Sequence, residues 1–352
     1  MTSGSARDRR WPGTSSTRSE QRTAHGGDNM KSLSMAAAAL AACGLASPAL
    51  ALAEPAWPAK PVRFVVAFAP AGPADIIARL LGHRLGEALG QSIVVENRPG
   101  AGGSVASAAV ARADSDGYTL LINTSSYAVN PAMQRNLGFD AEKDLTLAAL
   151  VASSPNLIVT APNLKARTLQ EVIAAAKSGD YNYGTAGAGT TPHLTAEYLF
   201  KVLARTPVTH IPYQGAGPAL TAAAAGQTQL ASVALPAAVE LVKAGKVRGL
   251  VVTGSKRSAA LPEVPTVAES GFPGFEDVTW VGVFAPARTP DAVLQRLNDE
   301  VARIQRDPDF QARLAATGFE PLGGTLPQAR KYLHDELAKW AKVVKETGAQ
   351  AN

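Results

Sequence analysis

Short apolar runs alternate with stretches of helical periodicity along most of this chain. Residues 62–68 form a run of β-branched and aromatic side chains, which is typical of a buried strand. Residues 69–72 predict a turn, and 73–89 carry apolar side chains at helical spacing. Pro73 suits the first helical position, and Asp75 complements the positive end of that helix. A strand, a glycine turn and a helix N-terminus can cradle an anion, although an ordinary βα unit has the same pattern.

The same alternation predicts a parallel αβ sheet in the first part of the chain. The further strands and helices expected there are 92–96, 105–113 and 118–123. Ligands of such sheets lie at the carboxyl ends of the strands. We therefore expect the loops 69–72, 97–104 and 124–127 to share one edge.

A long apolar run over 144–160, broken by Ser153-Ser154-Pro155, predicts a strand that leaves this first unit. The second series of expected elements is 169–177, 181–185, 191–203, 208–213, 219–225, 230–233, 237–244 and 247–253. A strand at 281–284 then returns the chain, and the helices expected after it are 290–306, 308–317 and 327–346. The predicted organisation is an N-terminal segment 1–53, one αβ domain built from 54–155 and 281–352, and a second from 156–280.

Two glycine-rich loops, one in each predicted domain, are the strongest candidate binding elements. Loop 186–190 precedes a helix that we expect Thr191 to cap, just as loop 69–72 precedes the first helix. Ser125 and Ser126 would add hydroxyl groups nearby. Neither loop contains Arg or Lys, so a carboxylate would be held there by backbone N–H groups and hydroxyls. Taken singly, each loop could also be an ordinary helix cap.

Catalytic and metal-binding patterns are sparse. The histidines His83, His193, His210 and His334 are scattered, and no two of them have metal-pair spacing. His83 and His334 are expected on the surface, whereas His193 adjoins a glycine loop and is a candidate ligand contact. There is no Gly-x-Ser-x-Gly elbow and no Walker lysine. We therefore expect no catalytic residue, no metal and no cofactor.

The beginning of the chain has the pattern of an export signal. Met30-Lys31 opens an alanine-rich apolar segment that ends in Ala51-Leu52-Ala53, a small-x-small cleavage site. We expect cleavage before Glu54, a periplasmic protein, and Met30 as the true start. The alternative is a lipoprotein anchored at Cys43, the single cysteine of the chain. In either case disulfides and zinc–thiolate sites are excluded from the mature part.

Charge adds little to this interpretation. The chain carries 34 basic and 29 acidic residues, of which residues 1–53 hold six and three, so the remainder is close to neutral. No basic cluster is interleaved with aromatic residues, which argues against nucleic-acid binding. The roughly 300 residues after position 53 are enough for two domains with separate cores.

The motifs together resemble the Bug-type extracytoplasmic solute receptors of tripartite tricarboxylate transporters. They include Phe68-Ala-Pro-Ala-Gly-Pro-Ala-Asp75, Val94-Val-Glu-Asn-Arg-Pro-Gly-Ala-Gly-Gly103 and Tyr183-Gly-Thr-Ala-Gly-Ala-Gly-Thr190. Further matching segments are 57–66, 116–120, 213–218, 245–250 and 282–290, so the resemblance covers nearly all of 57–345.

The resemblance implies a type II periplasmic binding-protein fold, with two αβ domains, two crossovers and a cleft that closes on a small carboxylate. It implies a monomeric receptor that serves a membrane permease; a receptor for an envelope sensor and, more remotely, a secreted αβ enzyme are the alternatives. The ligand-binding residues expected are Phe68, Ala69, Pro70, Ala71, Gly72, Asp75, Ser125, Ser126, Gly187, Ala188, Gly189, Thr190, His193 and Tyr213. Asp75 belongs to the family pattern whatever the ligand, which favours a structural cap.

Three positions depart from the family pattern. Ala71 stands where a second glycine is usual, so its Cβ should restrict the turn. Gln229 and Val233 stand where acidic residues are usual. If those acids shape the far end of the pocket, this chain would favour a ligand with an apolar or aromatic end.

Overall fold

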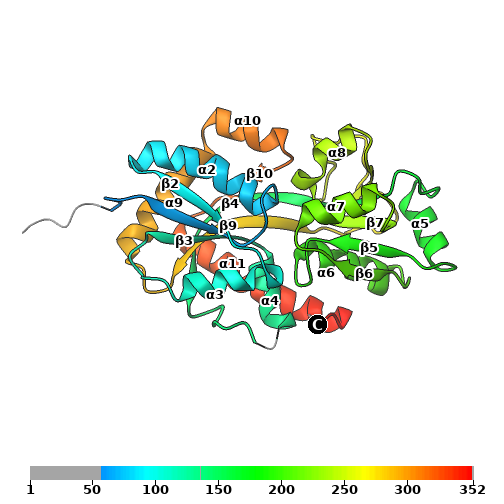
Figure 1. Cartoon of the computed structure of the whole chain (residues 1–352), viewed down its shortest axis with the longest axis horizontal. Helices are drawn as coiled ribbons and strands as arrows, with labels where there is room; N and C mark the ends of the chain where they lie inside the picture. Colours follow the sequence, from blue (N-terminus) through cyan, green and yellow to red (C-terminus); the bar gives the residue numbers. More distant parts are fainter. Residues whose placement is uncertain (1–56, 135, 351–352) are drawn as a thin grey trace, which may run out of the picture. The chain divides into compact units, whose positions relative to one another are not determined.

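The described part of the chain, residues 57–134 and 136–350 of a computed structural model, is organised around a ten-stranded sheet with helices on both faces (Figure 1). These residues belong to the unit Pro55–Asn352. The predicted extension, signal peptide, cleavage site and Cys43 lie outside the described residues. Among the described helices, none has the length and apolar character needed to cross a bilayer.

Apart from the two-residue β10, which was not predicted, the strands agree closely with the expected runs. They are β1 Val62–Val66, β2 Ile93–Asn97, β3 Thr119–Thr124, β4 Leu145–Thr160, β5 Asn182–Thr185, β6 Thr209–Pro212, β7 Leu230–Ala234, β8 Arg248–Val252, β9 Val278–Pro286 and β10 Glu320–Pro321. The helices of the first and last parts are α2 Pro73–Leu89, α3 Ser104–Ala111, α4 Ser126–Met133, α9 Asp291–Gln305, α10 Pro308–Ala316 and α11 Leu326–Thr347. Between them lie α5 Leu169–Ala176, α6 Thr191–Glu197, α7 Ala216–Ala224, α8 Val239–Lys243 and the short helices η1 Ala101–Gly103, η2 Tyr198–Leu203 and η3 Leu235–Ala237.

The parallel pairing predicted for the strands of the first part is confirmed, although the sheet as a whole is mixed. Strand β1 pairs in parallel with β2 and β3, and β5 pairs in parallel with β6 and β7. Strands β4 and β9 pair with each other in antiparallel orientation, and β9 is also antiparallel to β3. The reason is topological: the chain leaves the β1–β3 half along β4 and returns along β9, so the two strands must run in opposite directions.

Ser153-Ser154-Pro155 interrupts the apolar run but not the strand, and the single strand predicted over 144–160 is confirmed as β4. Residues 145–160 form one continuous strand, whose partner changes at this point. Pro155 is the last residue to face β9, and from Asn156 onwards the strand pairs with β7. The sequence signal therefore marks the place where β4 passes from one half of the sheet to the other.

The helix predicted after the first strand forms as expected. Ile77, Leu81 and Leu85 of α2 are fully buried, and they pack with β1 and β3 in one hydrophobic cluster. Gly90 ends the helix with a left-handed φ of 67°. Helices α2, α9 and α10 cover one face of the β1–β3 half, and α3, α4 and α11 cover the other (Figure 1).

Helix α4 is the main element that the sequence did not predict. Residues 124–127 were expected to end a strand in a loop, whereas a helix begins at Ser126. Pro131 lies inside this helix and obscured the pattern, because proline disfavours helix interiors. The consequence for function is direct, since Asn130 of α4 and Gln134, which caps the end of that helix, contact the loops described next.

Candidate functional site

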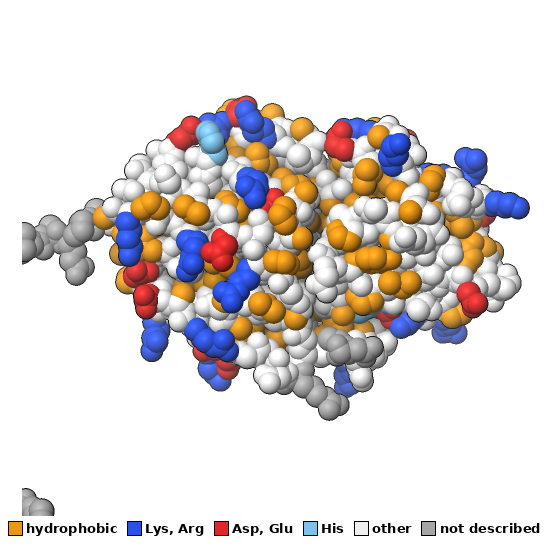
Figure 2. Space-filling view, in the orientation of Figure 1, with side chains coloured by type: hydrophobic (Ala, Val, Ile, Leu, Met, Phe, Trp, Pro, Cys, Tyr) orange, Lys and Arg blue, Asp and Glu red, His pale blue; other side chains and the backbone are white. Residues whose placement is uncertain are grey.

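A cavity of about 390 Å³ lies where the loops of the two halves of the sheet meet. Its walls are residues 68–69, 99–103, 134, 136, 186–188 and 212–214. None of these lining residues carries a charge; Arg135, between two of them in sequence, lies outside the described residues. On the face shown in Figure 2, charged side chains are likewise sparse along the middle, between α2 and α7.

The loops that frame this cavity touch across it through glycines. A Cβ built on Gly102 would lie 2.6 Å from the carbonyl oxygen of Ala188, closer than real side chains approach. A Cβ on Gly215 would lie 3.3 Å from that of Ala69. Gly102, Gly189 and Gly215 all have positive φ angles, between 63° and 133°. The two halves are thus in a closed arrangement that depends on the absence of side chains.

Asn130 of α4 fills the space between the two glycine loops. Its side chain is 2% exposed, and its Nδ2 donates a hydrogen bond of 2.9 Å to the carbonyl oxygen of Gly102. Its Oδ1 accepts from Gln134 Nε2 at 3.0 Å and would collide with a Cβ on Gly189. Beside it, the hydroxyls of Ser125 and Thr191 bond to each other across the same junction. Of these polar contacts, the bond between Ser125 and Thr191 joins the two halves, whereas those of Asn130 fix the loop of the first half.

The first loop is fixed by Asp75. Its carboxylate, 4% exposed, accepts from the Ala71 N–H at 3.0 Å and from Asn97 Nδ2 at 2.9 Å, and it pairs with Arg79. Burial alone would raise the pKa of Asp75, but hydrogen bonds from Arg79, Ala71 and Asn97 outweigh it and lower that pKa. Ala71 has a left-handed φ of 63°, which costs a residue with a Cβ about 1 kcal/mol. Asp75 thus stabilises a strained turn and does not line the cavity.

Unengaged donors are available on the cavity walls. The backbone N–H groups of Phe68, Ala69 and Ala188 donate to no other group among the described residues. The side chains of Asn136 and Tyr213 are also without a hydrogen-bond partner in the described part of the chain. Such a set of neutral donors is suited to a carboxylate or another small anion.

The structure brings only some of the predicted site residues to the cavity. Those on its wall are Phe68, Ala69, Gly187, Ala188 and Tyr213. Those that lie behind the wall are Pro70, Ala71, Gly72, Asp75, Ser125, Ser126, Gly189, Thr190 and His193. The wall also contains residues that were not predicted to bind a ligand. Residues 99–103 were expected only to lie at this edge of the sheet. Gln134 and Asn136 follow α4, a helix that was not predicted.

Thr190 and not Thr191 is the N-cap of α6, so the predicted cap is wrong by one residue. The Thr190 hydroxyl does not bond to the helix; it donates to the Gly187 carbonyl oxygen at 2.8 Å and is 2% exposed. The Thr191 hydroxyl is directed to Ser125 instead. Thr190 therefore shapes its own loop.

The two other departures from the family pattern lie away from the cavity. Gln229 accepts a hydrogen bond of 3.0 Å from the Asn182 N–H, and Val233, a residue of β7, is buried in a hydrophobic cluster. Neither lines the cavity. The expectation of an apolar or aromatic ligand end, which rested on them, therefore loses its basis.

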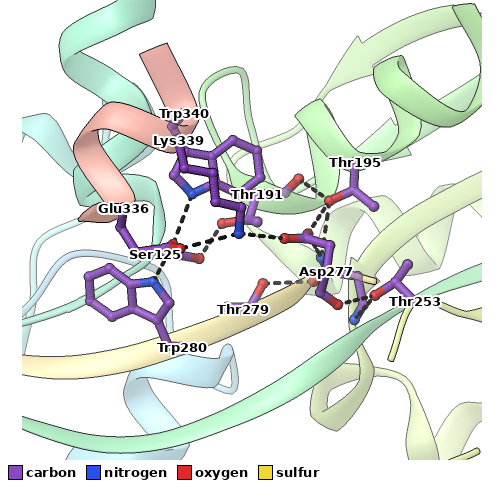
Figure 3. Close-up of polar contacts among 11 residues, drawn as sticks. Ser125, Thr191, Thr195, Thr253, Asp277, Thr279, Trp280, Glu336, Lys339 and Trp340 are labelled. Atoms are coloured by element: carbon purple, nitrogen blue, oxygen red, sulfur yellow. Dashed lines mark hydrogen bonds and ion pairs between the residues drawn. The ribbon is translucent and has the colours of Figure 1, made fainter. Parts of the chain in front are cut away.

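A buried polar cluster lies where β4 and β9 run between the two halves (Figure 3). Asp277, immediately before β9, accepts hydrogen bonds from Asn156 of β4 and Thr195 of α6. Lys339 of α11 lies 3.6 Å from Asp277 and 3.2 Å from Glu336, which in turn accepts from two tryptophan indoles. The cluster ties α6 and α11 to the crossing strands. Among the described residues, no three His, Cys, Asp or Glu side chains are grouped to hold a metal ion.

Comparison with known proteins places this geometry in a family. The model of the tripartite tricarboxylate transporter family receptor matches residues 77–349. BugT of Bordetella pertussis is 35% identical over 315 residues, which cover 88% of this chain and 95% of BugT.

Solved structures give the same result. Rpa4515 of R. palustris, solved with adipate, is 35% identical with a TM-score of 0.81 over 84% of this chain and 99% of that one. MatC of Rhodopseudomonas palustris, solved with malate, is 33% identical with a TM-score of 0.76 over 82% of this chain and all of MatC. The expected periplasmic-receptor fold is thereby confirmed. The chain belongs to the tripartite tricarboxylate transporter family receptors, the Bug-type family that its motifs resemble.

Proposed function

We propose that this protein is a periplasmic receptor that binds a small carboxylate between the two halves of its sheet and delivers it to a membrane permease. The observation that carries the proposal is the cavity wall, on which loops from both halves offer neutral, unengaged donors. Its volume, about 390 Å³, falls within the range of roughly 300–1,000 Å³ usual for small-molecule sites. The adipate and malate bound by the two relatives support a carboxylate as the ligand.

These donors explain how an anion can be bound although no Arg or Lys side chain is among the described residues of the cavity wall. Hydrogen bonds to a charged group contribute about 1.5–3 kcal/mol each. Phe68, Ala69 and Ala188 provide three such N–H groups, two from one half and one from the other. A ligand that bonds to both sides favours the closed arrangement, because only there do all three donors converge. Binding and closure are thus coupled.

Binding without turnover is the role that these residues support. The family and its solved relatives are binding proteins.

The permease subunits of a tripartite tricarboxylate transporter are the proposed partners, and delivery to an envelope sensor is the alternative. The proposed working form is a monomer. The proposed domain boundaries remain 54–155 with 281–352, and 156–280, because β4 and β9 pass between the two halves near 155 and 281.

A screen of carboxylates by thermal shift should identify the ligand. An acid at about 100 times its dissociation constant adds roughly 2.7 kcal/mol to the free energy of unfolding. Adipate and malate are the first probes, with adipamide as an uncharged control of the same length. We expect the acid, and not the amide, to raise the melting temperature. If no mono-, di- or tricarboxylate stabilises the protein, carboxylate capture is wrong.

The proposed location is the periplasm, reached by means of the segment from Met30 to Ala53. N-terminal sequencing of the exported protein should begin at Glu54. An acylated N-terminus at Cys43 would instead show a lipoprotein, and a full-length cytoplasmic chain would contradict export.

A further inference from the structure

Two histidines that the proposed binding step does not use lie directly behind the second binding loop. His193, in the first turn of α6, is 4% exposed, and its ring stacks on that of His210 of β6. The ring centroids are 3.8 Å apart and the planes differ by 23°. Neither histidine is among the residues of the cavity wall.

Each ring supports a different part of the loop 186–190. The Gly189 N–H donates to Nδ1 of His193 at 3.4 Å. Nε2 of His210 shares a hydrogen bond of 2.7 Å with the Thr185 hydroxyl, and the oxygen of that hydroxyl accepts from the Gly187 N–H at 3.2 Å. The two loop amides on either side of Ala188 are thus both tied to the histidine pair, one directly and one through Thr185.

We infer that His193 and His210 are positioning residues, which hold the amides of Gly187 and Gly189 inward so that the Ala188 N–H is left for the ligand. The inference rests on the proposed carboxylate function, since it assigns a purpose to that one free amide. The ring nitrogens of His193 and His210 would fix the shape of loop 186–190. Loss of either histidine should therefore weaken ligand binding, although neither side chain lines the cavity.

The hydrogen bond to His193 fixes the tautomer of that ring. Because the Gly189 N–H is a donor, Nδ1 must be unprotonated and the proton must be on Nε2, which lies 3.9 Å from Glu197. If the ring took up a second proton, it would be on Nδ1. The Nδ1–H and the Gly189 N–H would then be two donors facing each other, and the hydrogen bond to Gly189 would be lost. Protonation should therefore disturb the loop.

The surroundings of the pair keep it neutral near neutral pH. Burial, with Lys201 as a lesser cause, lowers the pKa of His193 to about 4, and burial with the neighbouring His193 lowers that of His210 to about 3. The other titratable groups facing the pair are Glu197, which pairs with Lys201, and Tyr183, whose hydroxyl donates to Glu197 at 2.5 Å. The loop should hold its shape above about pH 5 and lose it as pH falls through about 4.

Isosteric substitutions separate positioning from packing. Asn places an amide oxygen where Nδ1 of His193 lies, and Gln places one where Nε2 of His210 lies, so His193→Asn and His210→Gln can preserve the hydrogen bonds without titrating. His193→Leu fills similar space but removes the acceptor. His83→Asn is the control, because His83 is exposed on α2, far along the chain from the loop.

The first measurement needs no ligand. Amide exchange and NMR shifts of Gly187, Ala188 and Gly189 should change in His193→Leu, with exchange at Gly189 at least tenfold faster. His193→Asn and His83→Asn should leave them close to wild type. Unchanged loop amides in His193→Leu would overturn the inference whatever the ligand proves to be.

The second measurement uses adipate as the probe at pH 7.5 and at pH 4. At pH 7.5 we expect His193→Leu to raise the dissociation constant at least tenfold and His193→Asn by less than threefold. On going to pH 4, wild type should lose affinity more than His193→Asn does; the titration of adipate itself is common to both. Equal losses would contradict the positioning role. If adipate and the other acids of the screen do not bind wild type, the proposed function fails, and the loop amides still decide the inference.

Discussion

Gly102→Ala should weaken adipate binding by about a hundredfold or more, because the added Cβ cannot be accommodated in the closed arrangement. It would lie 2.6 Å from the Ala188 carbonyl oxygen and 3.1 Å from Asn130 Oδ1. The first neighbour is a backbone atom and the second belongs to a buried side chain that is itself hydrogen-bonded, so neither can move without cost. The substitution should hold the two loops apart and separate the donors on the two halves.

Gly245→Ala is a closely matched control for this substitution. Gly102 has a φ of 63° and Gly245 a φ of 68°, so both alanines would carry a similar left-handed strain. No atom lies within 4 Å of a Cβ at Gly245. The two variants should therefore lose similar stability, and only Gly102→Ala should lose ligand.

Calorimetry and small-angle scattering together check this expectation. With wild type and with Gly245→Ala, adipate should reduce the radius of gyration as the two halves close. With Gly102→Ala the radius should stay at the ligand-free value at adipate concentrations that saturate the control. Equal affinity of the two variants would show that the ligand is bound without contact between the loops.

The elements of this fold could be predicted where the information is local. The α2 helix was predicted to within a residue because Pro73, its apolar face and Gly90 all lie within one segment. The α6 cap was misplaced by one residue because Thr190 and Thr191 are both acceptable caps by type. Their hydroxyls are distinguished only by distant partners, Gly187 for one and Ser125 for the other.

The binding wall was less predictable because it depends on contacts between distant segments. The glycines of 99–103 indicated a loop at the correct edge, but not that Gly102 meets Ala188 from the other half. Asn130 could not be found at all, since Pro131 concealed its helix. His210, in a short strand, carried no signal that it would stack on His193. Such pairings are fixed by tertiary packing and not by local pattern.

The buried cluster at the crossing strands should make stability depend on pH through Asp277. Its side chain is 8% exposed, and this burial raises its pKa to about 6, although Lys339 and the Thr195 hydroxyl act in the opposite direction. The folded protein therefore binds this proton more tightly than the unfolded chain, whose Asp titrates near 3.8. The contribution to the free energy of unfolding is largest below about pH 4, falls as pH rises to about 6, and is constant above that.

Asp277→Asn should remove this dependence, because Asn resembles the protonated carboxyl at every pH. A shift of about two units corresponds to roughly 3 kcal/mol. Between pH 4 and pH 7.5 the free energy of unfolding of the variant should thus rise by about 3 kcal/mol relative to that of wild type, whatever its absolute stability.

His193 and His210 have an opposite pH dependence, but they are present in both proteins and cancel in the difference. Urea unfolding at several pH values measures it, with the exposed Asp180→Asn as control. A difference that stays constant from pH 4 to 7.5 would mean that Asp277 is ionised throughout, with Lys339 compensating fully for its burial.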